Sequence, residues 1–155
     1  MLTLERIVDR DAFWNINQKY LYEMTLYYDD EMDEEGNYHY GHFDSYFAGD
    51  PEREALYLRA DGKLVGFALL NRYSHLGEAI DHAMAEFTVF PAFRRRGYAS
   101  AAVRQILADR PGSWEIKFNI NNQKAAAFWT GITAAYAPRR VSVNDCEDVL
   151  RFEVR

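Results

Sequence analysis

Apolar and polar residues alternate along several short runs of the chain, a pattern typical of β-strands that bury one face. This alternation predicts strands at residues 2–8 and 113–120. Residues 83–90 are apolar enough for a central strand, and residues 149–155 are expected to form a closing strand. Residues 55–73 contain two further β-rich runs, separated by Asp61-Gly62. This dipeptide readily adopts the positive φ angles of a tight turn, so we expect an antiparallel hairpin there.

Other segments place apolar residues on one face of a helix. In the first of them, five residues recur at helical spacing and predict one buried stripe: Phe13, Ile16, Tyr20, Met24 and Tyr27. Either Asp9 or Asp11 can cap this helix at its N-terminus. Further helices are predicted over residues 97–109 and 123–129, and a solvated acidic loop over residues 29–37. Strands and helices together predict a mixed α/β domain.

Length and composition indicate one domain over residues 1–155. The chain is 48% hydrophobic and 27% charged, and no linker, repeat or low-complexity segment divides it. No apolar run approaches the roughly 20 residues of a membrane span, and the first residues lack the order of a signal peptide. Cys146 is the only cysteine, which excludes an internal disulfide and a thiolate metal cluster. We therefore expect a cytoplasmic protein without a membrane partner.

The net charge changes how one basic segment is interpreted. With a formal charge of −6, the chain is not expected to bind nucleic acid through its overall field. Three consecutive arginines, Arg94, Arg95 and Arg96, are a local exception on this acidic background. Any anion that they attract is therefore expected to be small.

These arginines lie between a predicted strand and a predicted helix, an arrangement typical of an anion-binding turn. The first N–H groups of a helix lack internal partners and carry the positive end of its dipole. Gly97 allows the backbone to approach an anion closely, and the small Ala99 and Ser100 leave the helix start accessible. The same pattern also occurs as a plain charged turn, so these residues alone leave both interpretations open. Walker and GxGxxG patterns are absent, which argues against nucleoside triphosphates and dinucleotides.

Two motifs in the chain resemble those of a known family. Residues 94–99 (RRRGYA), directly after FTVFP, resemble the acetyl-coenzyme A signature of the GNAT superfamily of N-acetyltransferases. Residues 122–129 (NQKAAAFW) resemble the second motif of that family. One predicted helix and one predicted strand separate the two motifs, as in the family. The predicted element order also matches over nearly the whole chain, and most loosely over residues 29–54.

The resemblance implies the GNAT fold: a central mixed, mostly antiparallel sheet flanked by helices, whose splayed middle strands hold the cofactor. It implies that acetyl-coenzyme A, with no metal, is the co-substrate. The residues that it implies for cofactor binding are Phe87, Thr88 and Val89 on the strand, Arg94, Arg95, Arg96, Gly97, Tyr98, Ala99 and Ser100 at the turn and helix start, and Asn122, Phe128 and Trp129 in the second motif. Backbone amides of the turn would hold the pyrophosphate, with the guanidinium groups assisting from the rim. A main-chain N–H near Val89 would polarise the thioester carbonyl.

Glu86 is the candidate general base, because several relatives place a glutamate on the strand just before the splay. It would take a proton, through water, from the acceptor ammonium. The alternative for Glu86 is a surface carboxylate paired with an arginine, and the alternative for Phe128 is core packing. Trp129 departs from the family, because many relatives carry a tyrosine there that protonates the departing thiolate. Tyr136 or water would supply that proton, or no acid is needed.

Residues 27–47 combine acidic and aromatic side chains where relatives build their acceptor pocket. Carboxylates and aromatic faces suit a cationic amine, although charge runs are also common in plain solvated loops. His39 and His42 lack the further ligand that a metal site needs. The acceptor is expected to be a small-molecule amine or a peptide amine. A homodimer would match many relatives.

We therefore expect an N-acetyltransferase that moves acetyl to an amine by direct attack in a ternary complex. The first alternative is a non-catalytic acyl-coenzyme A-binding module or sensor, which would keep residues 94–100 but not need Glu86. The second is an interaction domain whose arginines contact acidic partners, which would bind no cofactor at all.

Overall fold

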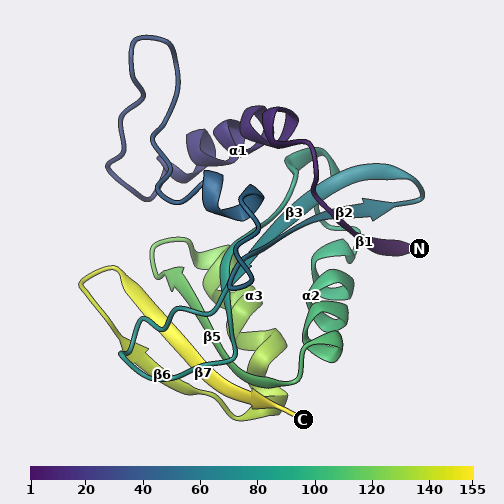
Figure 1. The fold of residues 1–155 in the computed structure, drawn as a ribbon. Coiled ribbons are helices and arrows are strands. Elements are labelled where there is room, and N and C mark those ends of the chain that lie inside the picture. The colour runs from purple at the N-terminus through teal and green to yellow at the C-terminus, as the bar shows by residue number, and fades with distance from the viewer.

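The computed structural model describes all 155 residues and contains one seven-stranded sheet in the order β1-β2-β3-β4-β5-β7-β6 (Figure 1). The strands are β1 (Leu2–Arg6), β2 (Glu54–Ala60), β3 (Lys63–Asn71), β4 (His82–Val89), β5 (Gly112–Asn119), β6 (Arg139–Ser142) and β7 (Glu147–Val154). All neighbouring strands are antiparallel except β4 and β5. The predicted mixed, mostly antiparallel sheet is thus confirmed.

Three α-helices accompany the sheet: α1 (Arg10–Met24), α2 (Tyr98–Asp109) and α3 (Gln123–Thr133). Of the two candidate caps for α1, the structure uses Asp9, whose carboxylate accepts a hydrogen bond from the Ala12 amide at 3.1 Å. The helix ends at Met24, so Tyr27, the last residue of the predicted stripe, lies in the turn that follows the helix. Single turns of 3-10 helix occupy Asp44–Phe47, Pro91–Phe93 and Ala134–Tyr136. No helix is both long and apolar enough to cross a membrane.

The sheet separates two hydrophobic cores. On one face, Phe13 of α1 packs edge-on against Phe67 of β3 at 4.9 Å between ring centroids and stacks on Phe43 at 5.7 Å. On the other face, α2 and α3 cover the larger core, in which Trp114 of β5 is fully buried. The strands β2 and β3 contribute alternate residues to the two cores, whereas the core side chains of β5 and β7 belong to the larger one. Residues 29–37, nearly all exposed, form a loop that projects from the molecule beside α1 (Figure 1).

The turn between β2 and β3 has the predicted geometry. Asp61 and Gly62 have φ angles of 52° and 80°, and β2 pairs with β3 in antiparallel register on either side of them. The positive φ angles explain why this dipeptide stands at the turn.

Gly66 permits the close approach of β3 to β4, and its replacement gives a stability prediction. A Cβ at this position would lie 2.1 Å from the carbonyl oxygen of Thr88. Gly66→Ala is therefore expected to destabilise the protein by about 2 kcal/mol or more, because backbone on both strands must move. Gly131→Ala is the matched control: its Cβ meets nothing within 4 Å inside α3. That change should be neutral or stabilising by up to about 1 kcal/mol. Urea unfolding measures both, and equal stabilities would contradict the prediction.

Candidate functional site

The strands β4 and β5 run side by side for a short distance and then separate. Their paired residues are His82 with Trp114, Ala83 with Glu115, and Met84 with Ile116. Beyond Met84, β4 keeps its other partner, β3, as far as Val89, which pairs with Gly66. The main chain of residues 85–89 therefore has no strand on its β5 side. An extended ligand can pair with such a free strand edge through main-chain hydrogen bonds.

A β-bulge at Ala85 determines where the side chains of this free segment point. Leu69 of β3 pairs with Glu86, and the register shifts at the next β3 residue so that Ala85 is left over. Ala85 packs with the core under α1, and Glu86 also reaches α1. Phe87 lies on the opposite face, against the core covered by α2 and α3. Without the bulge, strict alternation would put Glu86 on the same face as Met84.

Two tyrosines hydrogen-bond the Glu86 carboxylate from different elements. The hydroxyl of Tyr20 in α1 donates to Oε1 at 2.9 Å, and the hydroxyl of Tyr40 donates to Oε2 at 2.9 Å. Burial raises the pKa of Glu86 above its usual range, while the two phenol bonds and the charge of Lys117 offset part of this rise. A carboxylate whose pKa is raised toward neutrality suits a general base. The alternative of an arginine-paired surface carboxylate does not hold, because no arginine contacts Glu86.

The turn between β4 and α2 presents a row of free amides. No backbone acceptor lies within hydrogen-bond distance of the N–H groups of residues 95–100, and no side chain caps α2. By contrast, Asp9 caps α1 and Asn122 caps α3. Six consecutive free amides at the positive end of a helix dipole form a site for an anion.

Backbone conformation holds these amides in place. Gly97, the residue before α2, has a φ of 81°, and Arg95 has a φ of 65° although it carries a side chain. A Cβ at Gly97 would meet no protein atom within 4 Å, so the glycine is needed for its left-handed conformation rather than for packing space. Left-handed non-glycine residues such as Arg95 are uncommon and concentrate at functional turns.

The three arginines have different surroundings, which refines the expectation that all assist from the rim. Arg94 forms two hydrogen bonds of 2.7 Å with the carboxylate of Glu23 at the end of α1. Its Nε also donates to the carbonyl oxygen of Val89 at 2.7 Å. Arg94 therefore fastens α1 to the end of β4. Arg95 and Arg96 are exposed and form no ion pair, although the Arg96 guanidinium lies over the Phe93 ring at 5.6 Å from its centroid. Neither positive charge is therefore neutralised by a carboxylate.

The second motif lines the opposite side of the splay. The Phe128 ring lies parallel to that of Phe87, with centroids 6.3 Å apart, and Trp129 contacts both rings edge-on. Asn122 accepts a hydrogen bond from the Ala125 amide at 3.2 Å and so caps α3. Phe87, Phe128 and Trp129 together form an aromatic wall beside the free segment of β4.

Tyr136 is not brought together with these residues. Its ring stacks on Phe152 of β7 at 5.3 Å, and Phe152 pairs with Trp114 of β5. Trp114 in turn pairs with His82, at the far end of β4 from Val89. Val89 lies seven residue steps along the strand from His82, roughly 23 Å at 3.3 Å per step. The suggested acid role of Tyr136 therefore has no geometric support.

The acidic loop is held at both ends by tyrosine–carboxylate bonds. Tyr28, just before residue 29, donates to Glu147 of β7 at 2.8 Å, and Tyr40, three residues after the end of the loop, donates to Glu86. Asp29 and Asp30 are exposed between these two attachments. The loop therefore begins and ends at carboxylates of the site.

Sequence reasoning missed Tyr20, Tyr40 and Tyr28 as partners of carboxylates. It placed Tyr20 in a buried stripe, and a buried phenol needs a hydrogen-bond partner, which was a usable signal. Which carboxylate each phenol meets could not be found from the sequence, because the partners lie 66, 46 and 119 residues away. His39 and His42 belong to no group of three or more side chains placed to hold a metal ion.

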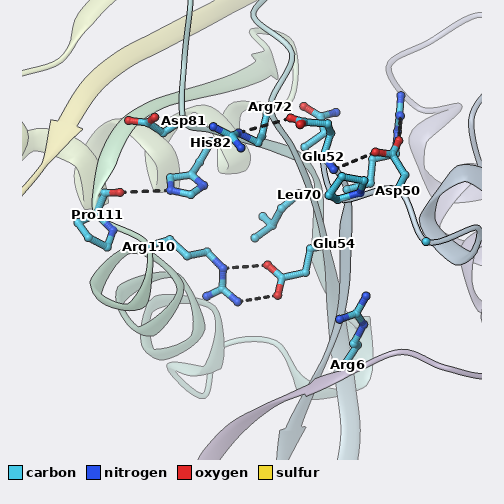
Figure 2. A pocket seen from close by; sticks show the side chains of 14 residues that line it. Arg6, Asp50, Glu52, Glu54, Leu70, Arg72, Asp81, His82, Arg110 and Pro111 are labelled. Carbon is cyan, nitrogen blue, oxygen red and sulfur yellow. Dashed lines mark hydrogen bonds and ion pairs between the residues drawn. The ribbon is translucent and has the colours of Figure 1, made fainter.

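A cavity of about 620 Å³ lies elsewhere, at the His82 end of β4 and the C-terminal end of α2 (Figure 2). Its charged side chains are mostly matched with one another. The ion pairs are Arg110 with Glu54 at 2.9 Å, Arg53 with Asp50 at 2.6 Å and Arg72 with Glu52 at 3.5 Å. The cavity is therefore separate from the splay and from the free amides, which lie at the other end of α2.

Comparisons with known proteins agree with this geometry. The model of a family described as acetyltransferase (GNAT) matches residues 11–131. An acetyltransferase from Thermus thermophilus is 18% identical with a TM-score of 0.72, over 99% of this chain and 97% of that chain. The PaiA N-acetyltransferase of Thermoplasma acidophilum, solved in complex with coenzyme A, is 8% identical with a TM-score of 0.62, over 99% of both chains. Arabidopsis thaliana NAA60, solved with acetyl-CoA, is 12% identical with a TM-score of 0.60, also over 99% of both chains. No curated protein sequence matches the chain.

Proposed function

Because the chain belongs to the GNAT family of acetyltransferases, which use acetyl-coenzyme A, we propose that it acetylates an amine with Glu86 as general base. The observation that carries this proposal is the enclosed Glu86 carboxylate, placed on the free segment of β4 that leads into the row of unpaired amides. A non-catalytic acyl-coenzyme A-binding module would need the amides but would not need this carboxylate.

The residues of the splay fit acetyl-coenzyme A. The free amides of residues 95–100 match a pyrophosphate, with Arg95 and Arg96 beside them. The main chain of residues 87–89 can pair with the amide groups of the pantetheine arm, since β5 has turned away. The aromatic wall would pack along that arm. A main-chain N–H at Val89 would polarise the thioester carbonyl and stabilise the oxyanion.

Glu86 acts on the acceptor in this proposal. An acceptor ammonium loses a proton to the Glu86 carboxylate through a water molecule, which leaves a neutral amine with a free lone pair. That nitrogen attacks the thioester carbonyl carbon. The new C–N bond forms as the C–S bond breaks, and the bonding electrons leave with sulfur. The attacking nitrogen gives up its extra proton to water as the amide forms. Trp129 cannot protonate the thiolate and Tyr136 lies far away, so water also supplies the proton that the thiolate takes up.

Initial-rate kinetics test this proposal. Rates measured over a grid of acetyl-coenzyme A and amine concentrations should give intersecting double-reciprocal lines, because direct attack needs both substrates bound together. Cys146→Ser should leave kcat within about twofold, since this half-buried thiol lies in the β6–β7 turn and takes no acetyl group. Parallel lines, or a burst of acetylated enzyme, would contradict direct attack. Coenzyme A binding without turnover on any amine would favour the non-catalytic module.

A cationic acceptor is the finer part of the proposal. Tyr28 and Tyr40, which flank the acidic loop, hydrogen-bond to Glu147 and Glu86. The loop carboxylates Asp29 and Asp30 form no ion pair. Negative charge beside the base would attract a substrate with a positive group.

Asp29→Asn with Asp30→Asn should therefore raise KM for cationic amines by roughly 3- to 10-fold, since exposed charges contribute up to about 1 kcal/mol. KM for acetyl-coenzyme A should stay the same, and added salt should shrink the difference. The control pair is Asp109→Asn with Glu153→Gln, which changes net charge equally on exposed positions of α2 and β7. An unchanged KM for every active amine at low salt would remove the cationic acceptor from the proposal.

A further inference from the structure

The two phenols on Glu86 are themselves held firmly. The Tyr20 ring packs edge-on against Phe67 of β3, with centroids 5.3 Å apart. Close to Tyr40 in the chain, Tyr38 is buried and bonded twice to Gln18 of α1. The Tyr38 amide donates to Oε1 of Gln18 at 2.6 Å, and Nε2 of Gln18 donates to the Tyr38 carbonyl at 2.9 Å. Both hydroxyls therefore occupy defined positions.

Both phenols remain donors throughout the neutral range. Burial and the neighbouring Glu86 raise the pKa of Tyr20 and of Tyr40 above that of a free tyrosine. Each hydroxyl therefore keeps its proton and directs it at one oxygen of the carboxylate. With one lone pair of each oxygen occupied in this way, the carboxylate cannot turn without leaving a buried acceptor unsatisfied.

We propose that Tyr20 and Tyr40 are positioning residues for acetyl transfer, which hold the Glu86 carboxylate in one orientation so that its remaining lone pairs face the acceptor. This inference rests on the proposed role of Glu86 as base. It assigns a task to two residues from α1 and the α1–β2 segment, neither of which belongs to the two sequence motifs. Orientation of this kind is effective because a small displacement of a catalytic group is costly.

The same bonds favour the ionised form of Glu86. The other groups that act on it are Lys117 on β5, which lowers its pKa, and Glu147 on β7, which raises it. The hydroxyls of Tyr28 and Tyr46 also lie near, and both are neutral because their own pKa values are raised. Burial raises the pKa of Glu86 and each phenol hydrogen bond lowers it, so loss of either phenol donor should raise this pKa further.

Tyr20→Phe and Tyr40→Phe, made separately, test the inference. Each keeps the ring and its packing, so folding is expected to survive and is checked by thermal melting. The acid limb of the kcat/KM profile should move up by about one pH unit, the shift expected from one lost hydrogen bond to a charged group. KM for acetyl-coenzyme A should stay within twofold while kcat falls. The matched control is Tyr22→Phe, an exposed tyrosine of the same helix, which should change neither quantity.

The possible outcomes separate this inference from the function on which it rests. An acid limb that stays in place in both variants, while Glu86→Gln still abolishes it, overturns the positioning role and leaves the base. A Glu86→Gln enzyme as active as wild type overturns the base itself. Carbon-13 NMR titration of the Glu86 carboxyl in the free protein needs no turnover. Equal midpoints in wild type and both phenylalanine variants would overturn the inference whatever the activity, and higher midpoints in the variants would support it.

Discussion

Glu86→Gln is expected to lower kcat for acetyl transfer by about 10²- to 10⁴-fold, the usual contribution of a general base. The amide has the shape of the carboxylate and can still accept hydrogen bonds from Tyr20 and Tyr40, but it cannot take a proton at neutral pH. KM for acetyl-coenzyme A should change little, because Glu86 faces α1 whereas the aromatic wall, which includes Phe87, lies on the other face of the sheet. Continuous detection of released thiol measures both constants.

The defect should shrink as the pH rises toward the pKa of the acceptor amine. An amine that is already neutral needs no base, so the remaining difference at high pH reports orientation alone. Glu153→Gln, an exposed carboxylate of β7, is the control and should behave as wild type. A Glu86→Gln enzyme with wild-type kcat at pH 7 would contradict the proposed mechanism, whereas the family assignment would stand.

Gly97→Asp is expected to weaken coenzyme A binding by about 100-fold or more, equivalent to about 2.7 kcal/mol. The new Cβ would point into the open space that no protein atom occupies, at the mouth of the six free amides. Its carboxylate would repel the pyrophosphate and compete for the same N–H groups. The φ of 81° adds strain, since side chains disfavour this region. Isothermal titration calorimetry gives the dissociation constant directly.

Two controls separate these causes. Gly97→Asn has the same size and tolerates the left-handed conformation but carries no charge, so its effect should be clearly smaller. Gly77→Asp imposes comparable backbone strain at a φ of 69° in the β3–β4 loop, where a Cβ also meets nothing. Coenzyme A affinity should be unchanged in that variant. If Gly97→Asp bound coenzyme A with wild-type affinity, the proposal that the free amides of residues 95–100 hold the pyrophosphate would be wrong.

Local features of the chain were predictable because they depend on neighbours in sequence. Alternation located β1 and β5, and Asp61-Gly62 located the hairpin turn between β2 and β3, because both signals depend on preferences within a few residues. The strand–glycine–helix order of residues 89–103 likewise predicted a free helix N-terminus, because unpaired first-turn amides follow from helix geometry itself. The motif at residues 122–129 predicted the helix that Asn122 caps in the same way.

Side-chain surroundings were less predictable, as the arginines illustrate. Of three consecutive arginines, one forms an ion pair and two do not, because only Arg94 lies within reach of Glu23, 71 residues earlier. Tyr136 is close in sequence to Trp129, yet the register of β7 places it at the opposite end of β4. Sequence distance carried no information about either contact.

The sequence by itself determined the order of elements, the small-anion turn and the candidacy of Glu86, because strand alternation, helix ends and charge are properties of short segments. Tertiary structure alone decided which way Glu86 faces and what surrounds it. One extra residue in β4 reverses the alternation after Ala85, and the packing of α1 and the acidic loop brings Tyr20 and Tyr40 to the two carboxylate oxygens. Contacts of this kind depend on register and on layer packing across the whole sheet, and no short stretch of chain encodes them.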